Sequence, residues 1–562
     1  MTKQLARWLS PLLLFLPLLA AGQGERPPVT NAYFIQNAIV VQQPGTVLEM
    51  GGVIIRDGLI QAVGKNLKAP ADAKVLEGDS LYVYAGFIDG LSNVGIPKPK
   101  EETGRPEVKD PGNPPNAIAG IQPERSAADM VDASDKSVEE LLALGFTAAH
   151  VVPYGSMLPG QGAIILLGGR GQTGAVYRPE SSFFSQFEGS RGVYPATTMA
   201  IMAKWRELYL QAKQSKDHSA RYSSAARGMA RTAYDETLEA FYPVIDGKQP
   251  VFFAVENVKD VFRALGLAKE MGFQLALANA DHVEPALADI KASKTPLFLS
   301  LDLPEEKKKE EKKEGSSGSD STRTTPTPTI DTKMEERRAA AQRMFEEQAA
   351  AVAKAGVSFG FSTLTAKSKD IRANLGRMIK AGLTEDQALA ALTTAPAALL
   401  GLSDVMGTVE KGKIANLVVT DKPYFAEGSN VRYVIVDGVP KEYEAKKKKK
   451  ASDPNAKVSA VGTWSITVDV PGQTTTSVLE ITGTADDLSG TITAEGETRQ
   501  LSGVSLSGDA LTFTSQFSAG GQNLTLSFDL TVDGDSLDGS VQVGSFGTFD
   551  VEGSRTSKPD RQ

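Results

Sequence analysis

Few side chains in this sequence are suited to bind a metal ion or to act as a nucleophile. The 562 residues include only three His and no Cys, although imidazole and thiolate are the usual ligands of zinc-like ions. His150 stands in an apolar stretch and His218 in a polar one, which is typical of structural and surface histidines. His282 follows Asp281, just after the apolar run 275–278. We therefore keep Asp281 and His282 as candidates for a general acid and base.

The composition limits the classes of protein to which the chain can belong. At 562 residues it is too long for one hydrophobic core, so several domains are expected. The formal net charge of −8 is spread along the chain and gives no basic face, so no nucleic-acid partner is predicted. The absence of cysteine excludes disulfides and thiolate metal sites together.

The N-terminus has the features of an export signal, residues 1–22. Lys3 and Arg7 precede an apolar run at 9–19, and small residues follow at 20–22, where a signal peptidase would cut. The run is shorter than the roughly 20 apolar residues needed to cross a bilayer. We expect an exported protein, periplasmic or extracellular, with no membrane span after cleavage of the signal.

The candidate residues must be positioned by strands, because apolar runs typical of strands alternate with helical patterns after Gly86. The strand-like runs are 146–152, 163–167, 251–255, 275–278 and 296–301. The helical patterns are 259–271, 335–355 and 384–400. Strands that alternate with helices favour an α/β fold, and residues 86–402 suit a (β/α)8 TIM-type barrel, which usually takes about 250 residues.

The segments outside this barrel are predicted to be β structure and linkers. Residues 29–85 and 403–443 contain short strands and turns, and together they are expected to form a small split β-sandwich domain. A charge run and a Ser/Thr/Pro tract predict a disordered insertion at 304–332. The Lys-rich residues 444–457 read as a linker. Residues 458–556, with alternating strands and regular turn signals, predict an additional C-terminal all-β domain.

Four segments resemble the amidohydrolase superfamily, and most of all its imidazolonepropionase-related, metal-dependent branch. In chain order they are IIRDGLIQAVG from Ile54, GFIDGLSNVG from Gly86, PVFFAVENVKDVFRALGLAKEMG from Pro250, and the stretch from Gly382 to Val439. The resemblance covers about residues 30–443. It implies a barrel whose family activity is the hydrolysis of carbon–nitrogen bonds in non-peptide amides, with zinc or another divalent metal.

The positions at which that family carries its metal ligands hold other residues in this chain. The family motif GFIDxHxH falls on residues 86–93, where both histidines are missing. The positions that correspond to the family's ligands are Leu91, Asn93, Ala254, Asn279 and Leu364, or Thr363 in place of Leu364 if the register shifts by one. Hydrocarbon side chains and neutral amides are poor ligands for such ions, so no cofactor is predicted.

Three functions remain open at this point. The first is a metal-free pseudoenzyme that binds a small molecule, or that pairs with another copy or with a related amidohydrolase. The second is an active amide or C–N hydrolase with a rearranged site, in which Asp281, His282 and carboxylates such as Glu256 act as acid and base. The third is a glycan-binding or surface-binding protein that acts through its C-terminal β domain, where Trp464 would offer an aromatic surface.

Overall fold

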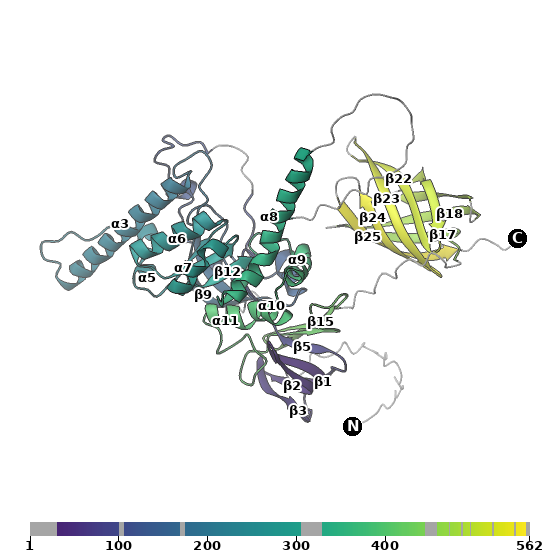
Figure 1. The fold of residues 1–562 in the computed structure, drawn as a ribbon, viewed down its shortest axis with the longest axis horizontal. Helices are drawn as coiled ribbons and strands as arrows, with labels where there is room; N and C mark the ends of the chain where they lie inside the picture. Colours follow the sequence, from purple (N-terminus) through teal and green to yellow (C-terminus); the bar gives the residue numbers. More distant parts are fainter. Residues whose placement is uncertain are drawn as a thin grey trace, which may run out of the picture. The chain divides into compact units, whose positions relative to one another are not determined.

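A computed structural model describes residues 31–100, 106–168, 175–304, 329–443 and 458–557, apart from short gaps at 471–472, 485–486, 495, 520–521 and 544–546. The chain divides into two compact units, 1–445 and 446–562 (Figure 1). The predicted signal peptide, the linker 444–457 and residues 305–328 of the predicted insertion lie outside the described residues. None of the described helices is both long and apolar enough to cross a membrane.

The first unit contains a small β domain built from both ends of residues 31–443. Its strands are β1 (Ala32–Gln43), β2 (Thr46–Arg56), β3 (Leu59–Lys65), β4 (Lys74–Glu77), β5 (Tyr82–Ala85), β14 (Leu417–Thr420), β15 (Val431–Val436) and β16 (Val439–Glu442). Hydrogen bonds join them in one continuous sheet of order β16-β15-β14-β5-β1-β2-β3, with β4 beside β1. The split domain was predicted to be a β-sandwich, but its strands are hydrogen-bonded into one sheet. Bulges in β1 bend this sheet.

The two faces of this sheet pack against different cores, as alternation along a strand requires. Val83 and Leu417 belong to the core of the β domain itself. Their neighbours Tyr84 and Val418 belong to the core of the barrel. The β domain is thus attached to the barrel through one buried face of its sheet.

Eight strands form the barrel, in sequence order around the sheet. They are β6 (Phe87–Ser92), β7 (Phe146–Val151), β8 (Gly160–Leu166), β9 (Val176–Gln186), β10 (Val251–Ala254), β11 (Leu275–Ala280), β12 (Leu297–Ser300) and β13 (Phe359–Ser362). Between the two end strands, the Thr363 amide donates to the Leu91 carbonyl at 3.1 Å, and the Ser362 hydroxyl donates to the same carbonyl at 2.9 Å. These bonds link the end of β13 to β6.

The expected alternation of parallel strands and helices in a (β/α)8 barrel is broken at one strand. Strand β8 runs antiparallel to both β7 and β9, whereas the other neighbouring pairs of barrel strands are parallel. Only residues 152–159 connect β7 to β8, and 167–175 connect β8 to β9. Both connections are shorter than the dozen or so residues of a helical crossover between parallel strands, so the chain turns back directly.

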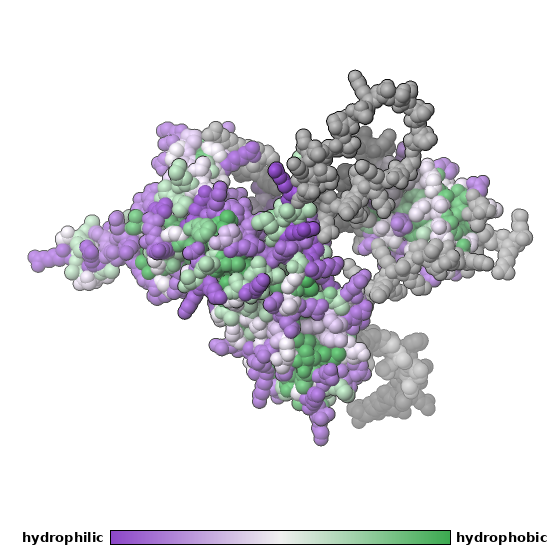
Figure 2. Space-filling view, in the orientation of Figure 1, coloured by the Kyte–Doolittle hydropathy of each residue, from purple (hydrophilic) through white to green (hydrophobic). Residues whose placement is uncertain are grey.

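Helices cover the outer face of the barrel. They are α1 (Asn116–Ala119), α2 (Lys136–Leu142), α3 (Thr198–Ser224), α4 (Glu236–Glu239), α5 (Tyr242–Ile245), α6 (Val258–Met271), α7 (Leu287–Ser293), α8 (Thr329–Lys354), α9 (Ser368–Lys380), α10 (Glu385–Leu392) and α11 (Thr394–Leu399), with 3-10 turns η1 (Ala127–Asp129) and η3 (Glu284–Ala286). Apolar residues of α3, α6 and α9, among them Trp205, Leu267 and Leu375, share the core with the strands. The far end of α3 extends away from the strands (Figure 1), and its surface is mainly hydrophilic in Figure 2.

The second unit is all β, as predicted. Its strands are β17 (Gly462–Val470), β18 (Gln473–Thr484), β19 (Asp487–Ala494), β20 (Glu497–Gln500), β21 (Ser502–Ser507), β22 (Ala510–Ala519), β23 (Gln522–Asp533), β24 (Ser536–Val543) and β25 (Gly547–Ser557). They form one antiparallel sheet in which the first strand, β17, pairs with the last, β25. Inward-facing residues such as Trp464, Phe513 and Phe528 make a core that is separate from those of the first unit.

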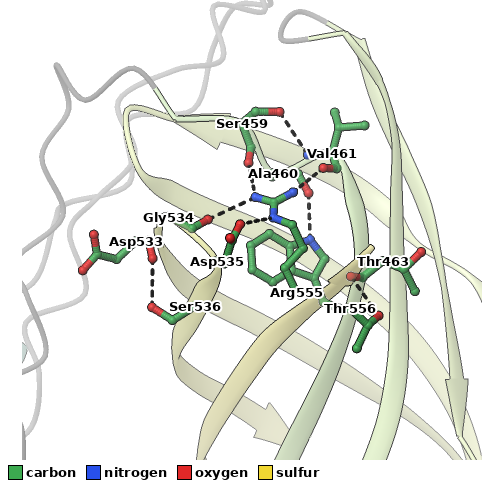
Figure 3. A network of polar contacts seen from close by, with 11 residues as sticks. Ser459, Ala460, Val461, Thr463, Asp533, Gly534, Asp535, Ser536, Arg555 and Thr556 are labelled. Carbon is green, nitrogen blue, oxygen red and sulfur yellow. Dashed lines mark hydrogen bonds and ion pairs between the residues drawn. The ribbon is translucent and has the colours of Figure 1, made fainter. Parts of the chain in front are cut away.

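An arginine covers the indole ring at one end of this core. The guanidinium carbon of Arg555 lies 3.9 Å from the centre of the Trp464 ring. Figure 3 shows the guanidinium donating hydrogen bonds to the carbonyls of Ser459, Val461 and Gly534 and to the Asp535 carboxylate. Trp464 is 0% exposed, and its indole N–H donates to the Ala460 carbonyl at 2.8 Å. Trp464 therefore offers no free aromatic surface.

Candidate functional site

A cavity of about 480 Å³ opens at the carboxyl ends of the parallel barrel strands, the place where the active sites of TIM-type barrels lie. Its walls come from the segments that follow β6, β7, β9, β10 and β13 and from the end of β11. The lining residues are Asn93, Pro153, Tyr154, Gly155, Phe184, Gln186, Phe187, Glu188, Thr198, Ala254, Glu256, Asn257, Asp260, Arg263, Asn279, Leu364 and Thr365.

Four of the five positions that correspond to the family's metal ligands lie in this wall. They are Asn93, Ala254, Asn279 and Leu364. Leu91 is fully buried below them, in an apolar cluster inside the barrel that also contains Phe252 and Phe298. The fold thus brings together residues that are far apart in the chain and that the family motifs had pointed to. At these positions the structure offers two amides and three hydrocarbon side chains.

Asn279 faces the cavity because of an irregular backbone. In β11, Ala276 and Ala278 point into the barrel while Leu277 and Ala280 join the outer core, so strict alternation would turn residue 279 outward. Instead its φ is +50°, a left-handed conformation that Asn tolerates better than most residues. The register with β12 shifts between Leu277 and Ala280. This interruption of the side-chain alternation turns the Asn279 amide towards the barrel mouth.

Both amides in the wall are already used in hydrogen bonds. Asn279 Oδ1 accepts from the Ser362 hydroxyl at 3.2 Å, and its Nδ2 donates to Thr365 Oγ1 at 3.3 Å. Asn93 Nδ2 donates to the Val152 carbonyl at 2.6 Å, which ties the end of β6 to the end of β7. These side chains fix the strand ends rather than presenting a free set of ligands.

Asp89, the carboxylate of the octet at residues 86–93, lies beneath the cavity and is fully buried. It accepts hydrogen bonds from the Thr363 hydroxyl, from the Thr363 amide at 3.1 Å and from the Leu91 amide at 3.3 Å. Burial raises the pKa of Asp89 to about 7, and these hydrogen bonds oppose the rise. The carboxyl therefore joins β6 to the segment after β13. Both of its oxygens are hydrogen-bonded, and Asp89 does not line the cavity.

Acidic residues that the sequence did not single out stand at the cavity mouth. Glu188 follows β9, and burial together with the nearby Glu256 charge raises its pKa. Asp260 is buried and pairs with Arg263, with 2.6 Å between Oδ1 and Nη1. Asn257, the N-cap of α6, donates to the other oxygen of Asp260 at 2.6 Å. Asn257 precedes the predicted helix 259–271, as an N-cap would, but this signal locates a helix start and not a group of charges.

Of the proposed acid–base candidates, Glu256 lines the cavity, whereas Asp281 and His282 do not. Burial, followed by the charge of Asp302, raises the pKa of Asp281 to about 7. His282 has a φ of +52°, and its ring packs edge-on against Phe345 of α8 with centroids 4.0 Å apart. Neither residue is among those that line the cavity. The two therefore do not form an acid–base pair facing a ligand in it.

The other two histidines have the structural surroundings expected of them. His150 is 0% exposed, and its Nδ1 donates to the Gly90 carbonyl at 3.0 Å while Nε2 accepts from the Ser182 hydroxyl at 2.8 Å. Burial lowers its pKa to about 4, which keeps the ring neutral. His218 lies in α3, where its Nε2 donates to the Ala230 carbonyl at 2.8 Å. Neither ring lines the cavity.

The side chains present do not fit a hydrolytic metal ion. Such ions in hydrolases are held by imidazole, thiolate or carboxylate groups, usually three or more from the protein. Leu91, Ala254 and Leu364 carry no donor atom, and the amides of Asn93 and Asn279 are held by neighbouring strands. Across the described ranges, no three His, Cys, Asp or Glu side chains are grouped so that they could hold a metal.

Comparison with known proteins gives one family match and several similar folds. The model of the Amidohydrolase family matches residues 322–441. The structure is similar to that of an amidohydrolase from Thermotoga maritima MSB8, at 22% identity and a TM-score of 0.58, covering 73% of this chain and 99% of the other. A putative prolidase from Bifidobacterium longum is more distant, at 16% identity and a TM-score of 0.43, covering 75% and 97%. No curated protein matches the sequence.

These comparisons support a resemblance to amidohydrolases but do not distinguish between branches of that family. The structural similarity, at this identity, establishes a shared fold, and the family model covers only the last part of the barrel and the returning strands. The imidazolonepropionase-related branch stays a prediction. The match at residues 322–441 confirms the predicted resemblance to the amidohydrolase superfamily, and the chain shares the fold of a solved amidohydrolase.

Proposed function

We propose that this protein is a metal-independent binding protein built on an amidohydrolase barrel, with the cavity at the barrel mouth as its ligand site. One observation carries the proposal: the family's ligand positions meet at one place, and none of them holds an imidazole or a carboxylate. The cavity is within the range of volumes that take small molecules. A scaffold that keeps the pocket but lacks the ligands supports binding without metal hydrolysis.

Export and partnership are further parts of this proposal. The apolar segment at residues 1–22 supports secretion to the periplasm or beyond. Pairing with a related amidohydrolase would give a binding subunit a catalytic partner, and pairing with another copy would give a binding oligomer. Size-exclusion chromatography with light scattering on the mature chain gives the self-association directly. A strictly monomeric protein that also captures no purified amidohydrolase would contradict this part.

The catalytic half of the proposal is tested by an assay for amide hydrolysis. The full-length mature protein is incubated with a panel of small amides, with and without added Zn²⁺, Mn²⁺ and Co²⁺, and a zinc amidohydrolase serves as positive control. We expect no metal-dependent turnover, because no bound water is activated without a bound ion. Turnover that rises with added metal and disappears with a chelator would contradict the proposal.

A second candidate function is hydrolysis by carboxylates without metal. Glu188 and Glu256 line the same cavity, and their mutual repulsion helps to raise the pKa of Glu188, as a general acid requires. Glu188→Gln and Glu256→Gln separate this candidate from pure binding. If an amide in the panel is cleaved without metal, each variant should lose that activity. Retained turnover in both variants would remove the carboxylates from the reaction.

The C-terminal unit gives less support to glycan binding. The aromatic residue that would stack on a sugar ring, Trp464, is 0% exposed and covered by Arg555 (Figure 3). A glycan array on the full chain still tests this candidate, and saturable binding that survives Arg555→Lys would have to come from other residues of the β surface.

A further inference from the structure

We propose that the ligand of the barrel cavity is an organic cation, a small molecule with an ammonium group joined to an apolar or aromatic part. The inference rests on the proposed function, because it takes the cavity as free of metal. It adds the chemical class of the ligand, which neither the fold nor the family similarity supplies. Charges at the mouth of the cavity and aromatic side chains in its wall both favour such a ligand.

The charged groups that line the cavity are predominantly negative. They are three carboxylates, of Glu188, Glu256 and Asp260, and one guanidinium, of Arg263. Asp260 and Arg263 neutralise each other through an ion pair of 2.6 Å. Glu188 accepts only a long hydrogen bond from the Gln186 amide, at 3.4 Å. Within the described ranges, neither Glu188 nor Glu256 is paired with a Lys or Arg side chain.

The two free glutamates interact with one another. The negative charge of Glu256 is one of the causes that raise the pKa of Glu188, after burial. Like charges held near each other are stabilised when a cation lies between them. In a metal-dependent barrel the bound ion supplies positive charge at this mouth, whereas in this chain the positions that correspond to its ligands supply none. An ammonium group on the ligand would provide the missing charge.

Aromatic and apolar side chains form the deeper wall. Phe184 is only 2% exposed, and Phe187 packs on Phe253 with ring centroids 4.4 Å apart. With Tyr154 and Leu364 they line the same cavity as the glutamates. Aromatic faces attract cations by about 0.5–2 kcal/mol, and they also bury apolar surface. A ligand with both features therefore matches the wall better than an anion or a sugar.

The test compares three probes of similar size on the full-length protein. Benzyltrimethylammonium carries the charge, benzyl alcohol is neutral and benzoate is an anion. Binding is measured by titration calorimetry and saturation-transfer NMR in low and high salt. We expect the cation to bind about tenfold more tightly than the alcohol, which corresponds to roughly 1.4 kcal/mol, and benzoate not to bind. High salt should weaken the cation alone.

Charge-neutral variants locate the effect at the cavity mouth. Glu188→Gln and Glu256→Gln, singly and together, should reduce cation binding stepwise towards that of benzyl alcohol. Glu49→Gln, which removes an exposed carboxylate of the β domain, is the matched control and should change nothing. Glu188 is only partly desolvated, and both glutamates reach the surface of the protein. The variants are therefore expected to fold, and circular dichroism checks this.

The outcomes separate this inference from the proposed function. No saturable binding of the cation, equal binding of the three probes, or full binding by the double variant would overturn the inference. None of these results would touch the proposal of a metal-independent protein, which is decided by the metal content of the same samples. A sample with stoichiometric metal and amide turnover would overturn the proposed function instead.

Discussion

Asp89 is the ionisable residue of the segment 86–93, and its protonation can be followed through the pH dependence of stability. Its carboxyl is fully buried and held by the Thr363 hydroxyl and by two backbone amides. Burial raises its pKa from 3.8 to about 7, while an unfolded chain keeps a value near 3.9. The folded protein therefore binds this proton more tightly than the unfolded chain does. The contribution of Asp89 to stability falls as the pH rises from about 4 to about 7, and it is constant above that.

Asp89→Asn should remove this pH dependence. Between pH 4 and 7 the unfolding free energy of the wild-type barrel should fall relative to that of the variant, by at most about 4 kcal/mol. Urea unfolding at a series of pH values gives the difference. Asp79→Asn, at an exposed turn of the β domain, is the control and should parallel the wild type. Parallel curves for Asp89→Asn as well would contradict the assignment.

At the residue scale, sequence could give the identity of side chains but not their direction. The alignment to the family located Leu91, Asn93, Ala254 and Asn279, because strand motifs keep a fixed spacing. It could not show the left-handed backbone that turns Asn279 inward. It also missed Glu188, which lies in none of the four segments, and Arg263, which lies in one of them but at no ligand position. Glu188 follows β9 and Arg263 lies in α6, so only the fold brings them to one cavity.

Strands β6 and β12 show how tightly the barrel interior is filled. A Cβ atom on Gly90 would lie 2.0 Å from Cδ1 of Phe298 and 2.7 Å from the Phe361 carbonyl oxygen. Phe298 itself is fully buried in the cluster with Leu91. The octet thus requires glycine at position 90 because an aromatic ring from β12, the second strand along from β6 around the barrel, occupies the space. Such contacts leave little room below the cavity.

Gly90→Ala should therefore destabilise the barrel, by about 1–3 kcal/mol or more. Phe298→Leu in the same chain should recover part of that loss, although the Phe361 carbonyl would remain close. Gly266→Ala, in α6 where a Cβ meets nothing within 4 Å, is the matched control and should stabilise by about 0.5–1 kcal/mol. Chemical denaturation measures all four proteins. A neutral Gly90→Ala would show that the interior is looser than described.

The sequence predicted most elements well, and the two departures have local causes. The helix expected at 259–271 is present as α6, and the helical stretch expected from residue 384 begins at its N-cap Thr384. The single helix expected at 384–400 instead breaks at Thr393 into α10 and α11. Pro396 has no N–H to donate to the Leu392 carbonyl four residues earlier, and its ring would crowd that carbonyl in a continuous helix. Strand β8 was misassigned because its direction depends on the length of its connections.

On the scale of the whole molecule, the two units carry separate hydrophobic cores. That of the C-terminal unit contains only residues beyond 458 and is built around Trp464. Composition and turn spacing were enough to predict this domain as all β, since alternation and turns are local signals. The pairing of β17 with β25 joins the two ends of the domain, and no local signal encodes it.

Trp464→Ala should lower the stability of the C-terminal unit alone, by about 3–5 kcal/mol. The variant loses a fully buried indole together with the Arg555 contact. In calorimetry of the full chain, the transition of this unit should shift to lower temperature while that of the barrel stays in place. Gly90→Ala should do the reverse. A shift of both transitions by either variant would contradict independent cores.

The central proposal is that the amidohydrolase-like barrel of this chain works without a metal, and metal stoichiometry tests it most directly. The full-length protein is loaded with excess Zn²⁺, Mn²⁺ or Fe²⁺, desalted and analysed by inductively coupled plasma mass spectrometry, beside a zinc amidohydrolase treated in the same way. The account predicts far less than one retained ion per chain, because the ligand positions hold Leu91, Asn93, Ala254, Asn279 and Leu364. One tightly retained ion per chain would contradict it.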